Sequence, residues 1–155
     1  SITKIKGGTA YNVIDDQVVL SGTIRTFKPE TRRLIEKKLH DIAKGIAIAN
    51  GGDIDFTYIP GYPPTVNTKN ESIFAGNVAK NLVGAENVID EIDPSMGGED
   101  FAYFLNEKPG SYLYIGQQDK NHNSHLHTTS YDFNDDLLPI GANFWVELVN
   151  KFFQK

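Results

Sequence analysis

The sequence predicts an α/β fold in two parts, and three observations lead to this prediction. Residues 1–61 contain two stretches in which apolar and polar residues alternate, followed by a long amphipathic stripe and a third alternating stretch. A cluster of proline and glycine at 60–64 then interrupts the pattern. Beyond it, helical and strand periodicities take turns up to the end of the chain. We therefore expect one part over 1–61 and a second over 62–155.

The first part is expected to contain antiparallel strands and one helix. Residues 2–6 alternate before a pair of glycines, and residues 18–27 are rich in β-branched side chains, so the two stretches predict an antiparallel pair. Pro29 suits the first position of a helix, because its missing N–H would have no partner there. The helix should end near Asn50, where two glycines follow, and residues 54–58 predict a third strand. The apolar stripe of the helix is Ile35, Leu39, Ile42, Ile46 and Ala49.

The second part is expected to alternate helices with short strands. Thr68 or Asn70 can cap its first helix, and Gly84 can end it. The remaining predicted elements are a strand over 87–92, a helix over 99–105, a strand over 111–117 and a last helix that follows Asn134 or Asp135.

Composition excludes several classes of protein and site. The net charge is −5, which argues against a nucleic-acid partner, because phosphate binding requires a basic face. The chain has no cysteine, so disulfides and thiolate metal sites are excluded, and a cytoplasmic location is expected. No apolar run approaches the roughly 20 residues of a membrane span. The chain starts within a strand pattern, which suggests a fragment of a longer protein.

Three histidines lie close together in the segment 121–127. In an extended segment, His125 and His127 would face the same side, which suits two imidazoles on one metal ion. A solvated polar loop is the more common outcome for this spacing, because His-x-His is a weak signal. The spacing alone leaves both interpretations open.

Three further positions could bind a ligand. Gly97 and Gly98 precede a predicted helix start whose free N–H groups could bind an anion, although Glu99 can serve the helix dipole itself. Arg25 lies in a strand of apolar and hydroxylic residues, where it could hold a carboxylate or simply face water. Asn12 follows a glycine bend and is most often a turn former at such a position.

Five motifs in the same order resemble one family, the M20 peptidases, and within it the branch of hippurate hydrolase and the auxin-conjugate amidohydrolases. Together they cover nearly the whole chain, so they are far more specific than any single motif. They lie at residues 7–14, 22–27, 61–67, 96–101 and, as one motif, 126–127 with 131–135.

The resemblance implies a two-domain hydrolase of N-acyl amino acids or small peptides that uses two divalent metal ions, usually zinc, manganese, cobalt or nickel. In such enzymes a metal-bridged water, activated by a glutamate base, attacks the amide carbonyl. His127 resembles a metal ligand. Asn12 and Arg25 resemble substrate-gripping residues of a lid domain that forms homodimers, and Gly97 and Gly98 resemble the loop beside the substrate.

The resemblance also implies what this chain lacks. The remaining metal ligands and the glutamate base would precede residue 1, so 1–61 would be most of a ferredoxin-like lid and 62–155 the end of a zinc-exopeptidase-like catalytic domain. The isolated chain is then expected to be inactive, and the alternative is a non-catalytic dimerisation or binding module. Asp15 replaces a usual proline and is expected to loosen the turn after Asn12, and Thr129 replaces another. With the first lid strand missing, we predict that the strands at 18–27 and 53–59 pair directly, or that another chain's strand fills the gap.

Overall fold

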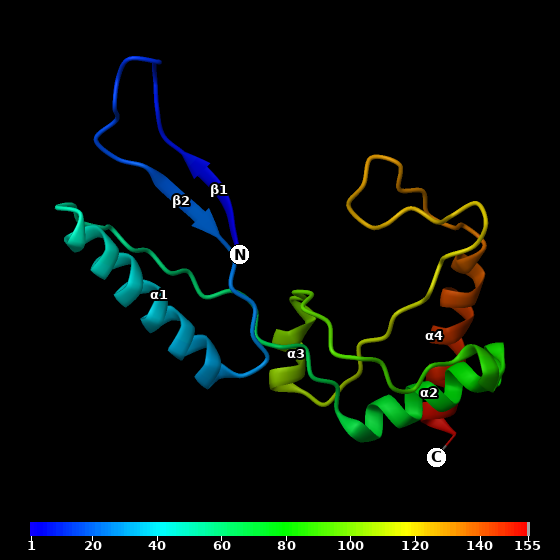
Figure 1. Cartoon of the computed structure of the whole chain (residues 1–155). Helices are drawn as coiled ribbons and strands as arrows, with labels where there is room; N and C mark the ends of the chain where they lie inside the picture. Colours follow the sequence, from blue (N-terminus) through cyan, green and yellow to red (C-terminus); the bar gives the residue numbers. More distant parts are fainter. Residues whose placement is uncertain (155) are drawn as a thin grey trace. The chain divides into compact units, whose positions relative to one another are not determined.

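The computed structural model describes residues 1–154, and Figure 1 shows its elements in chain order. The chain separates into two compact units. Unit 1 comprises residues 1–64 together with 96–98, and unit 2 comprises residues 65–95 and 99–154 of the described chain. Each unit is therefore built from segments that are discontinuous in sequence, because the short stretch 96–98 returns to unit 1.

Unit 1 contains the two strands and the longest helix. Strand β1 (Ile2–Lys6) pairs antiparallel with β2 (Val19–Gly22), with Ile5 opposite Leu20 and an irregularity in the register near the start of β1. Helix α1 (Pro29–Ala49) begins at the proline, as predicted. It ends at Asn50, which donates a side-chain hydrogen bond of 2.8 Å to the carbonyl of Ile46, and Gly51 follows with φ +76°.

The packed side of α1 differs from the predicted stripe. Ile35 and Leu39 are half-buried, but Ile42 and Ile46 are 58% and 62% exposed. No residue of α1 is fully buried. The helix therefore has a second apolar surface that unit 1 does not cover.

Unit 2 is built around two packed helices. Helix α2 (Lys69–Val83) packs against α4 (Leu137–Phe153), where the rings of Phe74 and Phe152 lie edge to face with centroids 6.3 Å apart. Gly84 ends α2 with φ +89°, a conformation that favours glycine, and the short 3-10 helix η1 (Ala85–Asn87) follows. Helix α3 (Phe101–Glu107) begins two residues later than predicted. The buried apolar side chains are Ala75, Val78 and Ala102.

Three predicted strands are absent from residues 1–154, namely those at 54–58, 87–92 and 111–117. Residues 54–58 do show the predicted alternation, since Ile54, Phe56 and Tyr58 are half-buried and their neighbours are exposed. The Phe56 ring contacts His40 of α1 at a centroid distance of 5.5 Å. The pattern thus correctly indicates an extended segment, but a strand also requires a hydrogen-bonded neighbour.

The predicted direct pairing of 18–27 with 53–59 is also wrong, because residues 53–59 form no strand that could pair. Strand β2 is shorter than expected and bonds β1 alone, while the N–H of Ile54 bonds the carboxylate of Asp53 at 2.8 Å. The segment at 111–117 instead forms its bonds with a side chain. The Asn67 amide donates to the Tyr112 carbonyl at 2.9 Å and accepts from the Tyr112 N–H at 2.8 Å. These two bonds reproduce those that a neighbouring strand would make.

No helix in the described part of the chain is long and apolar enough to cross a membrane.

Candidate functional site

The five residues predicted from the sequence to contact substrate or metal fall into both units. Asn12 lies in the connection between β1 and β2, Arg25 lies between β2 and α1, and Gly97 and Gly98 belong to the stretch that returns to unit 1. His127 belongs to unit 2. Four of the five are therefore parts of unit 1.

Arg25 and Gly98 lie in direct contact. A Cβ atom added to Gly98 would lie 2.9 Å from Nη1 of Arg25 and 3.6 Å from Cδ2 of Tyr62. The absence of a side chain at residue 98 therefore lets the guanidinium lie against the backbone. Arg25 is exposed, and no acidic side chain pairs with it within residues 1–154. An exposed, unpaired guanidinium can bind a carboxylate through two parallel hydrogen bonds.

A second arginine holds the chain beside this contact. Nη2 of Arg32, in α1, donates to the carbonyls of Gly61 and Tyr62 at 3.1 and 2.7 Å. Because the Tyr62 ring borders Gly98, these bonds fix one side of the contact between Arg25 and Gly98. No sequence pattern indicates this role, since Arg32 is one of several charged residues on the polar side of a helix.

Asn12 lies in a loop whose two sides are joined by hydrogen bonds to the side chain of Asp15. The Asp15 carboxylate accepts hydrogen bonds from the N–H of Gly8 and, at 3.3 Å, from the hydroxyl of Thr9. The expected loosening by Asp15 is therefore wrong, because the carboxylate links the two sides of the loop. Asn12 itself is exposed, and no hydrogen bond joins it to Arg25 within the described chain.

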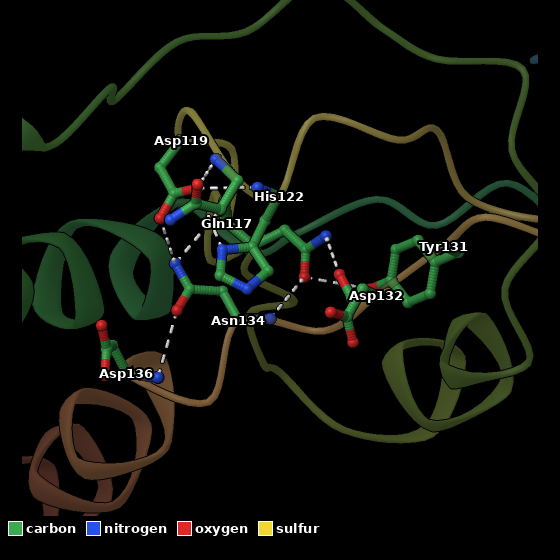
Figure 2. Close-up of polar contacts among 8 residues, drawn as sticks. Gln117, Asp119, His122, Tyr131, Asp132, Asn134 and Asp136 are labelled. Atoms are coloured by element: carbon green, nitrogen blue, oxygen red, sulfur yellow. Dashed lines mark hydrogen bonds and ion pairs between the residues drawn. The ribbon is translucent and has the colours of Figure 1, made fainter.

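In unit 2, His127 belongs to the segment 118–133, which we call the His127 loop. A network of polar side chains joins the two ends of this loop. Asn134 is 7% exposed and follows the loop directly. Its amide nitrogen donates to the Gln117 carbonyl and to the Asp119 carboxylate, both at 3.3 Å, so one side chain joins the two ends of the loop (Figure 2). The side-chain oxygen of Gln117 accepts from the hydroxyl of Tyr131 at 3.1 Å.

Asp119 and Asn134 also organise the backbone on either side of the loop. The Asp119 carboxylate accepts from the N–H groups of Asn121 and His122, each at 2.7 Å, and lies 2.9 Å from Nδ1 of His122 (Figure 2). The two backbone donors, with a further contribution from the His122 ring, hold the pKa of Asp119 below its ordinary value. The side-chain oxygen of Asn134 accepts from the N–H of Asp136 at 3.1 Å, in the turn just before α4. The N-cap of α4 is Asp136, and no side chain caps this helix start, so the predicted cap at Asn134 or Asp135 is wrong.

His127 lies in a turn rather than in an extended segment. Its φ is +64°, a left-handed conformation that few residues with a side chain adopt. Nearby, the hydroxyl of Thr128 donates to the carbonyl of His125 at 2.8 Å. The expectation that His125 and His127 face the same side of an extended segment is therefore wrong. The turn leaves both imidazoles exposed.

The described residues contain no cluster of metal donors. Across residues 1–154, no three His, Asp or Glu side chains are grouped so that they could hold one ion. A catalytic zinc site uses about three protein ligands and one open position. The described residues therefore do not form such a site by themselves, and His127 offers one accessible imidazole.

A tyrosine–glutamate pair that sequence reasoning missed lies at the start of α3. The hydroxyl of Tyr112 donates to the Glu99 carboxylate at 2.9 Å, and the other oxygen of that carboxylate accepts from the N–H of Phe101 at 3.3 Å. These bonds, that from Tyr112 first, lower the pKa of Glu99, and the same contact raises the pKa of Tyr112. The Asn67 bridge holds Tyr112 in place through its backbone.

Known proteins with similar sequences and structures agree on one family. Hippurate hydrolase of Campylobacter jejuni is 35% identical over 152 residues, which are 98% of this chain and 39% of that protein. IAA-amino acid hydrolase ILR1-like 4 of Arabidopsis thaliana is 31% identical over 98% of this chain and 36% of its own length. The chain thus spans less than half the length of these relatives.

A solved structure supports the same assignment. The YXEP protein of Bacillus subtilis, described as a dinuclear metal-binding peptidase of the M20 family, superposes with a TM-score of 0.76 and 32% identity. The match covers 96% of this chain and 40% of that protein, and it confirms the predicted α/β class. Residues 4–151 match the family described as peptidase family M20/M25/M40. The chain therefore belongs to the M20 peptidase family.

Proposed function

We propose that this chain forms part of a hydrolase that cleaves the amide bond of N-acyl amino acids or small peptides, and that its main contribution is to hold the substrate. The observation that carries the proposal is the exposed guanidinium of Arg25, which lies against Gly98 and has no acidic partner in residues 1–154. Hippurate and the IAA-amino acids named for the relatives are acylated amino acids with a free carboxylate. A bidentate arginine suits that group.

In this proposal the residues of unit 1 bind the substrate, and His127 of unit 2 binds metal. Arg25 binds the substrate carboxylate, and Gly98 leaves room for its guanidinium. Asn12 is a second substrate-binding residue in the lid part over residues 1–61. His127, in the part over 62–155, provides one ligand for a divalent ion such as zinc, manganese, cobalt or nickel. The other ligands and the general base would come from outside the described residues, so we assign no catalytic step to this chain.

The experiment is a comparison of Arg25→Gln with Arg33→Gln in the natural protein that carries this sequence. Arg33 is an exposed arginine of α1 and serves as a matched control. With hippurate as substrate and manganese or zinc added, Arg25→Gln should raise KM at least tenfold, the loss expected when a charged hydrogen-bonded pair is broken, while Arg33→Gln leaves it within about twofold. Equal KM values for the two variants would contradict the proposed role.

The isolated chain should not hydrolyse hippurate, because a single imidazole cannot supply the ligands of a hydrolytic centre. Purified chain with manganese or zinc should give no turnover above that of a His127→Ala variant. Turnover that exceeds this control would show that the chain contains a complete site.

A non-catalytic dimerisation module is the second candidate, and the surface of α1 favours it. Ile42 and Ile46 are more than half exposed, and unit 1 buries no apolar side chain fully. We propose that two copies cover this surface by pairing through unit 1. Light scattering should then show a dimer that Ile42→Glu disrupts and Lys44→Glu does not. Lys44 is an exposed residue of the same helix, so it controls for the added charge.

A further inference from the structure

A shallow pocket that is open to solvent, which we call the cavity, lies directly beside Arg25 within unit 1. Its volume is about 270 Å³, and it is lined by residues 25–28, Thr31, Ile35 and Met96. All of these residues belong to unit 1, because Met96 is part of the stretch that returns to it. The cavity therefore combines the start of α1 and the segment before it with the loop that contains Gly98.

The lining has an apolar wall and a cationic edge. Phe27, Ile35 and Met96 contribute apolar surface, whereas Arg25 and Lys28 contribute the two charges, and no acidic residue belongs to the lining. Neither cation pairs with a carboxylate in the described residues. Small-molecule sites have this composition, with mostly apolar walls and a few polar groups that orient the ligand.

We propose that this cavity binds the apolar group of a small organic carboxylate whose carboxylate group pairs with Arg25. This inference rests on the proposed function and adds to it the part of unit 1 that selects the substrate. The volume is slightly below the range of about 300–1,000 Å³ for sites of drug-sized ligands, so it accommodates one ring or one branched side chain rather than a long peptide. The unbranched thioether of Met96 can adapt to ligands of different shape.

Phe27, Ile35 and Met96 are then specificity-determining residues, because they set the size of the apolar group that fits. Met96 is the best position at which to test this, since it is 53% exposed and its replacement does not disturb a buried core. A tryptophan at this position would fill the cavity while leaving Arg25 and its charge in place.

The test is a metal-free binding titration of the chain, followed by two-dimensional NMR, with hippurate as the probe. For a ligand of this size we expect a Kd on the order of 1 mM. N-methylbenzamide has the ring without the carboxylate, acetate has the carboxylate without the ring, and inorganic phosphate is an anion of different shape. Each of these three should bind at least tenfold more weakly than hippurate.

Variants separate this cavity from other cationic surface. Arg25→Gln and Met96→Trp should each weaken hippurate binding at least tenfold, whereas Arg33→Gln, outside the cavity, should leave it within twofold. The inference fails if Arg33→Gln weakens binding as much as Arg25→Gln, if any of the three comparison compounds binds as tightly as hippurate, or if hippurate does not saturate.

The titration contains no metal and no turnover, so a failure of the cavity assignment can be distinguished from a failure of the hydrolase proposal. A natural protein that fails to cleave hippurate while this chain binds it through Arg25 would refute the proposed reaction and leave the cavity assignment intact. Cleavage with an unchanged KM in Met96→Trp would refute the cavity assignment and leave the reaction intact.

Discussion

Replacing Asn134 with alanine tests how α4 begins and how the His127 loop is closed. The side chain makes three hydrogen bonds, one that accepts from the Asp136 N–H just before α4 and two that reach Gln117 and Asp119 across the base of the loop. Loss of the bond to the Asp136 N–H costs about 1 kcal/mol. The other two bonds are long, at 3.3 Å, and their partners are accessible to water, so each contributes about 0.5 kcal/mol.

The total is about 2 kcal/mol, which corresponds to a fall of roughly 30-fold in the protection of nearby amides from hydrogen exchange. The amides to measure are those at the start of α4, at 136–138. Asn123→Ala is the matched control, because Asn123 is an exposed asparagine of the same loop and its side chain has no hydrogen-bonding partner in the described residues. It should change protection less than twofold.

A third variant separates the two roles of this side chain. Asn134→Asp keeps the oxygen that accepts from the Asp136 N–H but loses the donors to Gln117 and Asp119, and it places a second carboxylate near Asp119. Protection at the start of α4 should then be retained while exchange within the His127 loop accelerates. Equal protection in Asn134→Ala and Asn123→Ala would refute the reasoning for both roles.

Three further predictions concern the other named residues. Tyr112→Phe should raise the pKa of Glu99 toward its ordinary value, as measured by carboxyl NMR. Because the folded-state pKa of Glu99 is lowered, the contact stabilises the fold above about pH 4.3, and this stabilisation is lost as the pH falls through the folded-state pKa. An unchanged Glu99 titration would contradict this. Gly98→Ala should displace the Arg25 guanidinium, because the new Cβ would lie 2.9 Å from Nη1, and so weaken hippurate binding several-fold with less than about 0.5 kcal/mol lost in stability, by denaturant titration. Wild-type affinity in this variant would mean that the contact is unimportant. Zinc should bind the chain more weakly than micromolar by calorimetry, and a tighter site that His127→Ala abolishes would show that the ligand set is complete.

The parts of the fold that depend on local sequence were predictable. Pro29 and the glycines after Asn50 correctly indicate the ends of α1, because helix ends are decided by groups within a few residues. The alternation at 54–58 correctly indicates which side chains turn inward, since that depends only on the period of an extended chain.

The strand predictions failed because strand pairing involves two segments, and the pattern of one segment does not show whether a second segment lies beside it. Residues 54–58 lie extended on α1 without a neighbouring strand in the described chain, and 111–117 receives its bonds from the side chain of Asn67. A side chain that substitutes for a strand has no periodicity. The contacts around the candidate site were not predictable for a similar reason, since neither the contact of Arg25 with Gly98 nor the bond of Tyr112 to Glu99 joins residues that are close in sequence.

Three polar side chains share one structural role, which is to hold a segment of main chain in place. Arg32, Asn67 and Asn134 each bond the main chain of a segment far away in sequence. Arg32 does so beside Gly98, and Asn134 does so at the base of the His127 loop. Few apolar side chains are buried in either unit, so apolar packing alone does little to fix these segments. Hydrogen bonds are directional, so one side chain can specify the position of a loop that packing leaves loose. The positions of these segments therefore depend on polar side chains outside the proposed contacts. Substitution of Arg32 should alter ligand affinity more than substitution of exposed apolar residues that lie outside the cavity.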